Sequence, residues 1–243
     1  MSASNARDAP LPLIPEHLRP YLITPAAYLE QHKSENVAHL VVGTVVIGNG
    51  NRKGTQLYTP PSPPSRISHY QYPSTSHKKP LQHPQKVLLV QRSRHDYGGL
   101  CWEIPGGSCD PHDVSILDAA ARELTEEAGL RVRRFVAVVD RQRHEWIDRG
   151  ELWRKLTFIV EADDADTFAD GEDGYGEEQE RGRSPLPRVR LDPEEHEDFV
   201  WATREDLMVG GVGERMFTWI QDEQRQVILR ALDIVEGVSS TLP

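Results

Sequence analysis

The chain has 243 residues, of which 37% are hydrophobic, and a formal net charge of −10 at pH 7. This size and apolar fraction suit one globular domain with long insertions, or one domain with a small appendage. The negative charge is uneven, because residues 161–198 hold 15 acidic residues against 4 arginines, which leaves the rest of the chain at about +1. The absence of a strongly basic stripe argues against a nucleic-acid polymer as partner.

Cysteine usage and hydropathy indicate the compartment. Only Cys101 and Cys109 are present, too few for a zinc site of paired CxxC motifs or for a disulfide scaffold, so a reducing compartment is expected. Residues 1–20 lack the apolar core of a secretory signal, and the longest apolar run, residues 37–48, is too short to span a bilayer and contains His39. We therefore expect a cytoplasmic protein, with the nucleus as the alternative, and no membrane partner.

A short helix is predicted over residues 24–33, inside an N-terminal extension of residues 1–35. Thr24 is a favourable N-cap, and Pro25 suits the first helical position because its fixed φ is already helical. The extension precedes a single domain, which we expect to cover residues 36–237.

Two β-branched and apolar runs, residues 39–48 and 86–93, predict strands that are neighbours in one sheet. The connection between them, at about residues 50–86, holds seven prolines and several serines. Such a composition cannot bury enough apolar surface to form a packed core. We therefore expect a low-complexity loop insertion that hangs off the sheet.

The second half of the domain begins with two strand-like runs, residues 131–146 and 151–162, whose connection IDRG predicts a hairpin. An acidic insertion follows at about residues 163–192. A last short strand is expected around residues 199–201, with Thr203 as the cap of a turn beyond it.

An amphipathic helix is predicted over residues 214–237. Its apolar stripe consists of Met216, Trp219, Ile220, Val227, Ala231 and Ile234. Strands thus precede and follow a central helix, and another helix ends the chain. This order predicts an α/β fold in which helices cover both faces of a mixed sheet.

The central helix carries three glutamates on one face. It is expected to begin after Ser115, a good N-cap, and to end at Gly129, where a left-handed residue fits. Glu123, Glu126 and Glu127 stand at positions i, i+3 and i+4, where each like-charged pair destabilises a helix by about 0.2–0.5 kcal/mol. Taken alone, such a cluster is more often a solvated polar face than a metal site.

The residues around the helix favour a metal site. The glycines of PGG, residues 105–107, allow a backbone carbonyl to approach a ligand closely. Carboxylates and a backbone carbonyl are the oxygen donors that Mg²⁺ requires, and Mg²⁺ sites leave positions for water and substrate phosphates. Arg122, beside the first glutamate, could orient a carboxylate or contact a phosphate.

Residues 106–130, GGSCDPHDVSILDAAARELTEEAGL, resemble the Nudix box G-x5-E-x7-R-E-U-x-E-E-x-G-U, where U is an aliphatic residue. The second half matches at every defined position from Arg122 to Leu130. In the first half Asp113 stands where the family has glutamate, and eight residues, not seven, separate it from Arg122. The flanking sequences WEIPGG and EEHEDFVWATREDL are also similar to Nudix sequences.

The resemblance implies a Nudix-type α/β/α sandwich with a mixed β-sheet between helices and with both long loop insertions outside the shared core. It also implies a Mg²⁺- or Mn²⁺-dependent pyrophosphohydrolase that cleaves the diphosphate linkage of a nucleotide derivative by water attack at phosphorus. Divalent ions would neutralise phosphate charge and lower the pKa of the attacking water. The repulsion between the glutamates would then become metal affinity.

The resemblance also assigns roles to residues. Glu123 and Glu127 would be the main metal ligands, with Glu126 as a ligand directly or through water, and Gly107 would offer its backbone carbonyl. Glu123 and Glu126 are the carboxylates proposed for catalysis within the box, together with Arg122, which would hold a glutamate in place.

The general base and the substrate contacts stay open. The family uses either a box glutamate or a carboxylate from a later loop, for which Glu194, Glu195 and Glu197 are candidates against a plain solvated acidic turn. Glu103, Arg141 and Glu195 are candidate substrate-binding residues, although surface pairing on a hairpin is the commoner role for a residue such as Arg141. No histidine is assigned as a ligand.

Two other hypotheses remain. A Nudix-fold regulatory module could bind a nucleotide or a protein without turnover, which the irregular first half of the box favours and the intact glutamates disfavour. A diphosphate isomerase on the same fold lacks a compelling placement of cysteine and glutamate. The expected partner is a small nucleotide diphosphate derivative whose identity the sequence leaves open, and a homodimer is compatible with the sequence.

Overall fold

The computed structural model describes residues 10–48, 84–139, 144–165 and 186–237. Nearly all of the predicted low-complexity insertion and the centre of the acidic insertion lie outside the described residues. Within the described ranges, no helix is both long enough and apolar enough to cross a bilayer.

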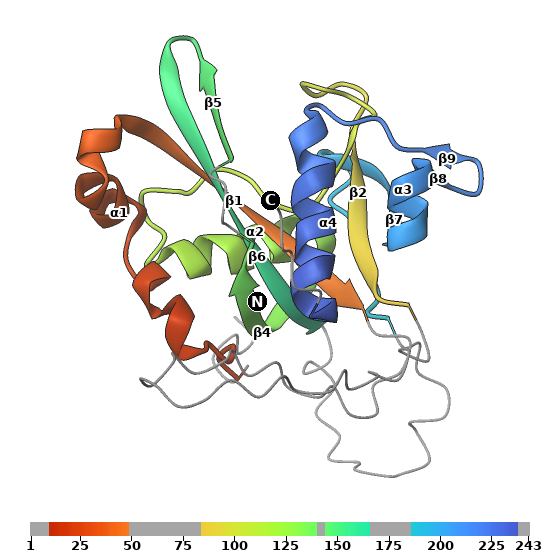
Figure 1. Cartoon of the computed structure of the whole chain (residues 1–243), viewed down its shortest axis with the longest axis horizontal. Coiled ribbons are helices and arrows are strands. Elements are labelled where there is room, and N and C mark those ends of the chain that lie inside the picture. The colour runs from red at the N-terminus through yellow and green to blue at the C-terminus, as the bar shows by residue number, and fades with distance from the viewer. Residues whose placement is uncertain (1–9, 49–83, 140–143, 166–185, 238–243) are drawn as a thin grey trace, which may run out of the picture.

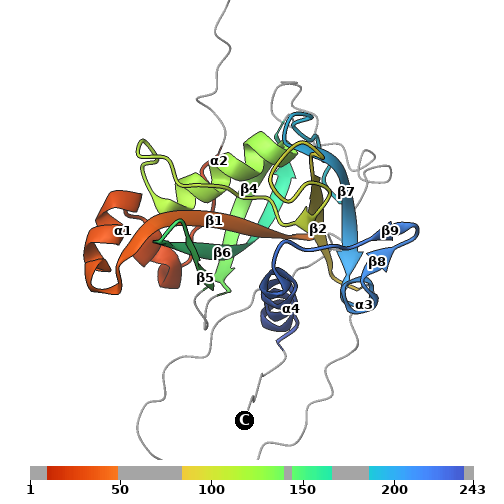
Figure 2. The same ribbon diagram turned by 90° about the horizontal axis from the view of Figure 1, so that it is seen from above.

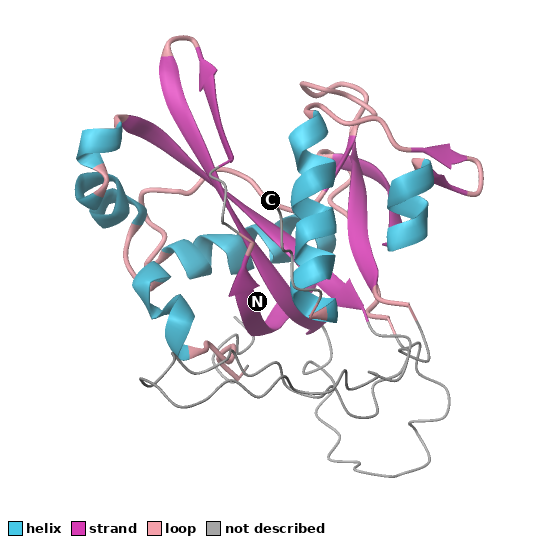
Figure 3. Ribbon diagram, in the orientation of Figure 1, coloured by secondary structure: helices cyan, strands magenta, loops and turns pink. Residues whose placement is uncertain are grey.

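A mixed sheet of seven strands forms the centre of the molecule (Figures 1 and 3). Its strands are β1 (Val37–Gly48), β2 (Lys86–Arg92), β3 (Trp102–Glu103), β4 (Leu130–Val138), β5 (His144–Asp148), β6 (Glu151–Asp164) and β7 (His196–Thr203). The order along the main path is β3-β2-β1-β6-β4, while β5 also pairs with β6 and β7 with β2. Strands β1 and β6 run parallel, and the other pairs are antiparallel.

Helices cover both faces of this sheet. They are α1 (Pro25–Gln31), α2 (Ile116–Ala128), α3 (Arg204–Val209) and α4 (Asp222–Glu236), with the 3-10 turns η1 (Glu16–Tyr21) and η2 (Lys33–Glu35). Figure 2 shows α2 and α4 on opposite sides of the sheet. The predicted arrangement of a mixed sheet between helices is therefore confirmed.

The two hydrophobic cores follow from the alternation of strand side chains. On β1, Val42 and Val46 are buried with Leu124 of α2, whereas Val45 points to the other face and is buried with Ile228 of α4. Because β1 contributes to both cores, it lies at the centre of the sandwich.

The N-terminal extension packs onto the hydrophobic core that lies between α2 and the sheet. Leu18 of η1 and Tyr28 of α1 are both buried there. Thr24 caps α1 as predicted, since its side chain accepts a hydrogen bond from Ala27 N at 3.2 Å, and Pro25 is the first helical residue.

The predicted strands are confirmed in part. Strands β1 and β2 are neighbours, with Ile47 opposite Val87. The predicted hairpin is wrong in one respect, because the run 131–146 contains two strands, β4 and β5, which both pair with β6. The turn between β5 and β6 uses Arg149 and Gly150, whose φ values of 49° and 86° reverse the chain within two residues.

The predicted C-terminal helix begins too early. Helix α4 starts only at Asp222, and residues 215–216 form the short strand β9, which pairs with β8 (Gly211–Val212). The aromatic run before α4 is held by a backbone bond from Trp102 N to Thr218 O of 2.7 Å. Met216, which the helical pattern placed in the apolar stripe, is 68% exposed.

Candidate metal centre

Helix α2 is bounded as the sequence indicates. The Ser115 side chain accepts a hydrogen bond from Asp118 N at 3.0 Å, and Gly129 ends the helix with a left-handed φ of 62°. The helix turns Glu123 and Glu127 towards the interior, where each is at most 9% exposed, and leaves Glu126 exposed. Two of the predicted glutamate ligands are therefore buried, and the third is in contact with solvent.

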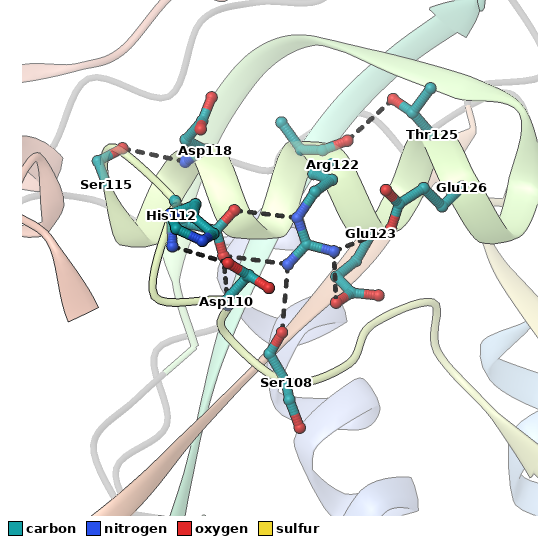
Figure 4. A network of polar contacts seen from close by, with 11 residues as sticks. Ser108, Asp110, His112, Ser115, Asp118, Arg122, Glu123, Thr125 and Glu126 are labelled. Carbon is teal, nitrogen blue, oxygen red and sulfur yellow. Dashed lines mark hydrogen bonds and ion pairs between the residues drawn. The ribbon is translucent and has the colours of Figure 1, made fainter. Parts of the chain in front are cut away.

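Arg122 connects the box glutamates to the preceding loop (Figure 4). Its Nη1 donates to Glu123 Oε1 at 2.9 Å and to Glu126 Oε2 at 2.8 Å. Its Nε and Nη2 donate to the two oxygens of Asp113 at 2.9 and 3.0 Å. These bonds raise the pKa of Arg122, with the Asp113 hydrogen bonds as the largest cause.

Asp113 reaches Arg122 in spite of the extra residue and the shorter side chain in the first half of the box. The carboxylate is buried and also accepts a hydrogen bond from Asp110 N at 2.6 Å. Burial alone would raise the pKa of Asp113, but the bonds from Arg122 outweigh it and keep the pKa below its usual value. Asp113 therefore lies in the site as a partner of Arg122.

The two glycines before the helix fit tightly against the glutamates. Gly106 N donates to Glu127 Oε2 at 2.7 Å, and a Cβ at Gly106 would lie 2.2 Å from Val42 O. A Cβ at Gly107 would lie 2.6 Å from Glu123 Oε2. The Gly107 carbonyl, a predicted metal ligand, accepts a hydrogen bond from Val42 N at 2.9 Å, which leaves its second lone pair for another partner.

One group of three side chains among the described residues could hold a metal ion together. The ligand atoms of Glu127, Glu195 and His196 all lie within 4.8 Å of one another. Glu123 and Glu126, predicted as ligands, stand outside this group. His196, which the sequence reading did not assign, stands inside it.

A second buried carboxylate faces the group. Glu103 of β3 is 4% exposed, receives a hydrogen bond from Arg92 Nη1 at 2.6 Å, and lies 3.5 Å from His196 Nε2. Burial alone would raise its pKa, but the nearby His196 ring, Lys155 and Arg92 outweigh burial and lower it. Glu103 is therefore an ionised carboxylate within the site.

Glu127 differs from Glu103 in its electrostatic surroundings. Burial raises the pKa of Glu127 to about 9, and the carboxylates of Glu103, Glu123 and Glu195 act in the same direction, against the Gly106 N–H. Burial likewise raises the pKa of Glu123. A cation placed among these carboxylates would remove their repulsion, so the donor set fits a divalent metal.

The sequence reading also missed a buried cation. Lys155 of β6 is 6% exposed, and its positive charge is one of those that lower the pKa of Glu103 against the effect of burial. The Lys155 side chain packs against Gly43 of β1, where an added Cβ would lie only 2.6 Å from Lys155 Cε. The available signal was the charged pair Arg154–Lys155 inside the mostly apolar run of residues 152–160.

The remaining predicted residues lie apart from the metal group or cannot be placed. Glu197 Oε1 accepts a hydrogen bond from Arg94 Nε at 2.8 Å, and Glu194 is exposed. Arg141 lies outside the described residues. Among the loop carboxylates proposed as general base, Glu195 alone belongs to the group with Glu127.

Fold and site together define an α/β/α sandwich with a candidate divalent-metal centre behind a glycine turn. Residues 80–222 match the family model of the NUDIX domain, which is more than half of the chain. The chain therefore belongs to the Nudix family, as its box sequence predicts. Nudix hydrolases act on nucleotide derivatives and generally use divalent metals.

Solved structures resemble the chain at low sequence identity. The MutT NUDIX hydrolase from Burkholderia pseudomallei is 15% identical, with a TM-score of 0.44 over 79% of this chain and 96% of that one. An Ap4A hydrolase binary complex from C. elegans is 15% identical, with a TM-score of 0.45 over 82% and 99%. The NUDIX domain of Shewanella oneidensis NrtR, complexed with ADP ribose, is 17% identical, with a TM-score of 0.46 over 88% and 99%. No curated protein matches the chain.

Proposed function

We propose that the protein is a divalent-metal-dependent pyrophosphohydrolase that cleaves the diphosphate linkage of a nucleotide derivative by water attack at phosphorus. The observation that carries this proposal is the buried Glu127 carboxylate, which faces Glu195 and lies near Glu123 behind a glycine turn. Buried carboxylates that repel one another without a counter-ion are stabilised by a divalent cation.

The metal would be held by oxygen donors from two elements. Glu123 and Glu127 of α2 would bind Mg²⁺ or Mn²⁺ with Glu126 directly or through water, and the Gly107 carbonyl would complete the set from the loop. When bound, the ion supplies charge neutralisation at the phosphate oxygens and lowers the pKa of a water.

The other residues position these groups and the substrate. Arg122 orients Glu123 and Glu126 through its shared Nη1. Lys155, a buried lysine whose charge acts on the nearby Glu103 carboxylate, is suited to hold a substrate phosphate. Glu195, exposed beside Glu127, is suited to accept the proton of the attacking water as general base.

The test is a hydrolysis assay with Mg²⁺ or Mn²⁺ and a panel of nucleoside triphosphates, ADP-ribose, NADH and dinucleoside polyphosphates, with products resolved by chromatography. We expect cleavage to a nucleoside monophosphate and a loss of at least about 100-fold in Glu127→Gln. A loss of this size follows because metal catalysis supplies several kcal/mol and each 1.36 kcal/mol is tenfold in rate. Glu205→Gln, the same change at an exposed position of α3, serves as the control and should keep full activity.

No cleavage across the panel, with Mg²⁺ binding intact by calorimetry, would contradict the hydrolase. That result would favour the nucleotide-binding module without turnover.

A further inference from the structure

His196 is a buried histidine without a conventional partner. It opens β7 opposite Arg92 of β2, and its backbone N donates to Asp192 O at 2.9 Å. The residue is 3% exposed, and among the described residues neither ring nitrogen makes a hydrogen bond. Leaving a buried polar group unpaired is unfavourable, so this imidazole calls for a ligand that the protein itself does not supply.

The surroundings of the ring indicate the kind of ligand. Carboxylate oxygens of Glu127 and Glu195 lie within 4.8 Å of a His196 ring nitrogen and of each other. They come from α2 and from the loop before β7, so the three ligand atoms converge from separate elements. Two carboxylates and an imidazole attract a cation, and their spacing would allow one ion to contact all three.

Glu103 is placed to orient the imidazole. Its Oε1 lies 3.5 Å from His196 Nε2, too long for a strong hydrogen bond, and Arg92 fixes the same carboxylate from the other side at 2.6 Å. Histidines that bind metals usually direct their other ring N–H at a carboxylate, which fixes the ring and its tautomer. Glu103 would thus be a positioning residue for His196.

We propose that a ring nitrogen of His196 is a metal ligand, and that it forms with Glu127 and Glu195 a mixed nitrogen–oxygen site that prefers a first-row transition ion such as Zn²⁺ to Mg²⁺. Mg²⁺ takes oxygen ligands, whereas imidazole suits zinc and iron. The inference rests on the proposed function in sharing Glu127. In the Zn²⁺-bound form Glu195 would be a ligand and not the general base, so this form is distinct from the Mg²⁺- or Mn²⁺-bound form that would hydrolyse the substrate.

The first measurement is NMR of the ring nitrogens in untagged protein labelled with ¹⁵N-histidine, titrated with Zn²⁺ and separately with Mg²⁺. We expect Zn²⁺ to move one set of ring resonances, and His196→Gln to remove that set. His144→Gln is the matched control, because His144 is also partly buried but its Nε2 is already bonded to Gln221 at 2.8 Å. The moving resonances should persist in the control.

Calorimetry measures the same site by affinity. We expect His196→Gln to weaken Zn²⁺ binding at least tenfold and to change Mg²⁺ binding by less than twofold. If His196→Gln fails to fold, Glu195→Gln takes its place, because the Glu195 side chain is exposed and its loss leaves the interior packed. The zinc-dependent ring shifts should then be weakened at low Zn²⁺ in Glu195→Gln.

The two proposals fail in different ways. Zn²⁺ that moves no ring resonance, or that moves resonances retained in His196→Gln, overturns the histidine ligand even where Mg²⁺-dependent hydrolysis is present. Ring shifts that depend on His196, in a protein that cleaves nothing in the panel, support the zinc site and contradict the hydrolase.

Discussion

At the scale of single residues, Gly106 shows how the backbone holds a carboxylate. Its φ is 153°, and a Cβ there would lie only 2.2 Å from Val42 O, so the turn has no room for a side chain. We expect Gly106→Ala to lower the free energy of unfolding by about 2–4 kcal/mol, because backbone atoms of β1 must shift. Mg²⁺ affinity should fall as well, because Glu127 loses its hydrogen bond from Gly106 N. Urea unfolding and calorimetry measure the two effects.

Gly150 provides the control for this change. Its φ of 86° is also left-handed, but nothing lies within 4 Å of a Cβ there. Gly150→Ala should therefore cost only the conformational strain, about 1–2 kcal/mol, and leave Mg²⁺ affinity unchanged. Equal losses in both variants would contradict the tight contact at Gly106.

Arg122 is the second residue whose contacts make a prediction. Its side chain is 30% exposed, but that of Asp113, which it binds through two nitrogens, is only 4% exposed. We expect Arg122→Gln to destabilise the metal-free protein by about 2 kcal/mol, less than for a fully buried pair, because solvent screens part of the loss. Arg94→Gln removes an exposed pair with Glu197 and should leave the urea midpoint unchanged. A similar midpoint in both variants would show that Asp113 does not depend on Arg122.

The residue scale also shows what the sequence could predict. The contact between Arg122 and Glu126 and the closeness of the three glutamates could be predicted from their spacing, because contacts within one helix are fixed by its geometry. His196 and Lys155 could not be found in this way. Their contacts depend on how β7 and β6 are placed in the sheet, which no local pattern specifies.

At the scale of elements, the cap of α2 holds the helix that carries the site. The Ser115 side chain accepts a hydrogen bond from Asp118 N at 3.0 Å, inside a buried first turn. We expect Ser115→Ala to cost about 1 kcal/mol, because an N–H of the first turn loses its acceptor, and Ser115→Gly to cost only a few tenths. Thermal unfolding of the two variants measures this difference. A larger loss in the glycine variant would show that the hydroxyl group contributes little.

The errors in predicting elements have a common physical origin. The helical pattern of residues 214–237 includes Met216 and Trp219, but aromatic and β-branched residues before Asp222 favour extended chain, and tertiary contacts with β3 decide the outcome. The run 131–146 predicts one strand for a similar reason, although the chain forms β4 and β5 there. Composition alone does not show that the chain stops pairing with β6 at the end of β4 and pairs with β6 again as β5.

At the scale of the whole molecule, the site exists because the sheet brings distant segments together. Glu103 on β3 and His196 at the start of β7 converge because β2 pairs with both strands. Glu127 of α2 is joined to them by the hydrogen bond from Gly106 N, in the turn after β3. The sequence predicts that the sheet is mixed, and the family box locates α2. The register of β7, which sets His196 opposite Arg92, is a property of the assembled sheet.

The convergence of carboxylates makes the stability of the whole metal-free protein depend on pH. The pKa of Glu127 is raised in the folded protein from 4.5 to about 9, so the folded state binds a proton that the unfolded state releases between these values. This contribution to stability is fully present below about pH 4.5 and is lost as the pH rises through about 9. In EDTA we expect Tm to fall between pH 6 and pH 9.

The size of the effect and its controls follow from the same linkage. Because Gln at position 127 does not ionise, we expect Glu127→Gln to be more stable than the parent at pH 9 in EDTA by at least about 5 °C, since 1 kcal/mol corresponds to about 2–4 °C in Tm for a chain of this length. Mg²⁺ should raise the Tm of the parent at pH 9, because the cation stabilises the ionised carboxylate, and should have little effect on Glu127→Gln. Glu205→Gln should keep the pH dependence of the parent. If the Tm of Glu127→Gln falls between pH 6 and pH 9 by as much as that of the parent, groups other than Glu127 cause the pH dependence.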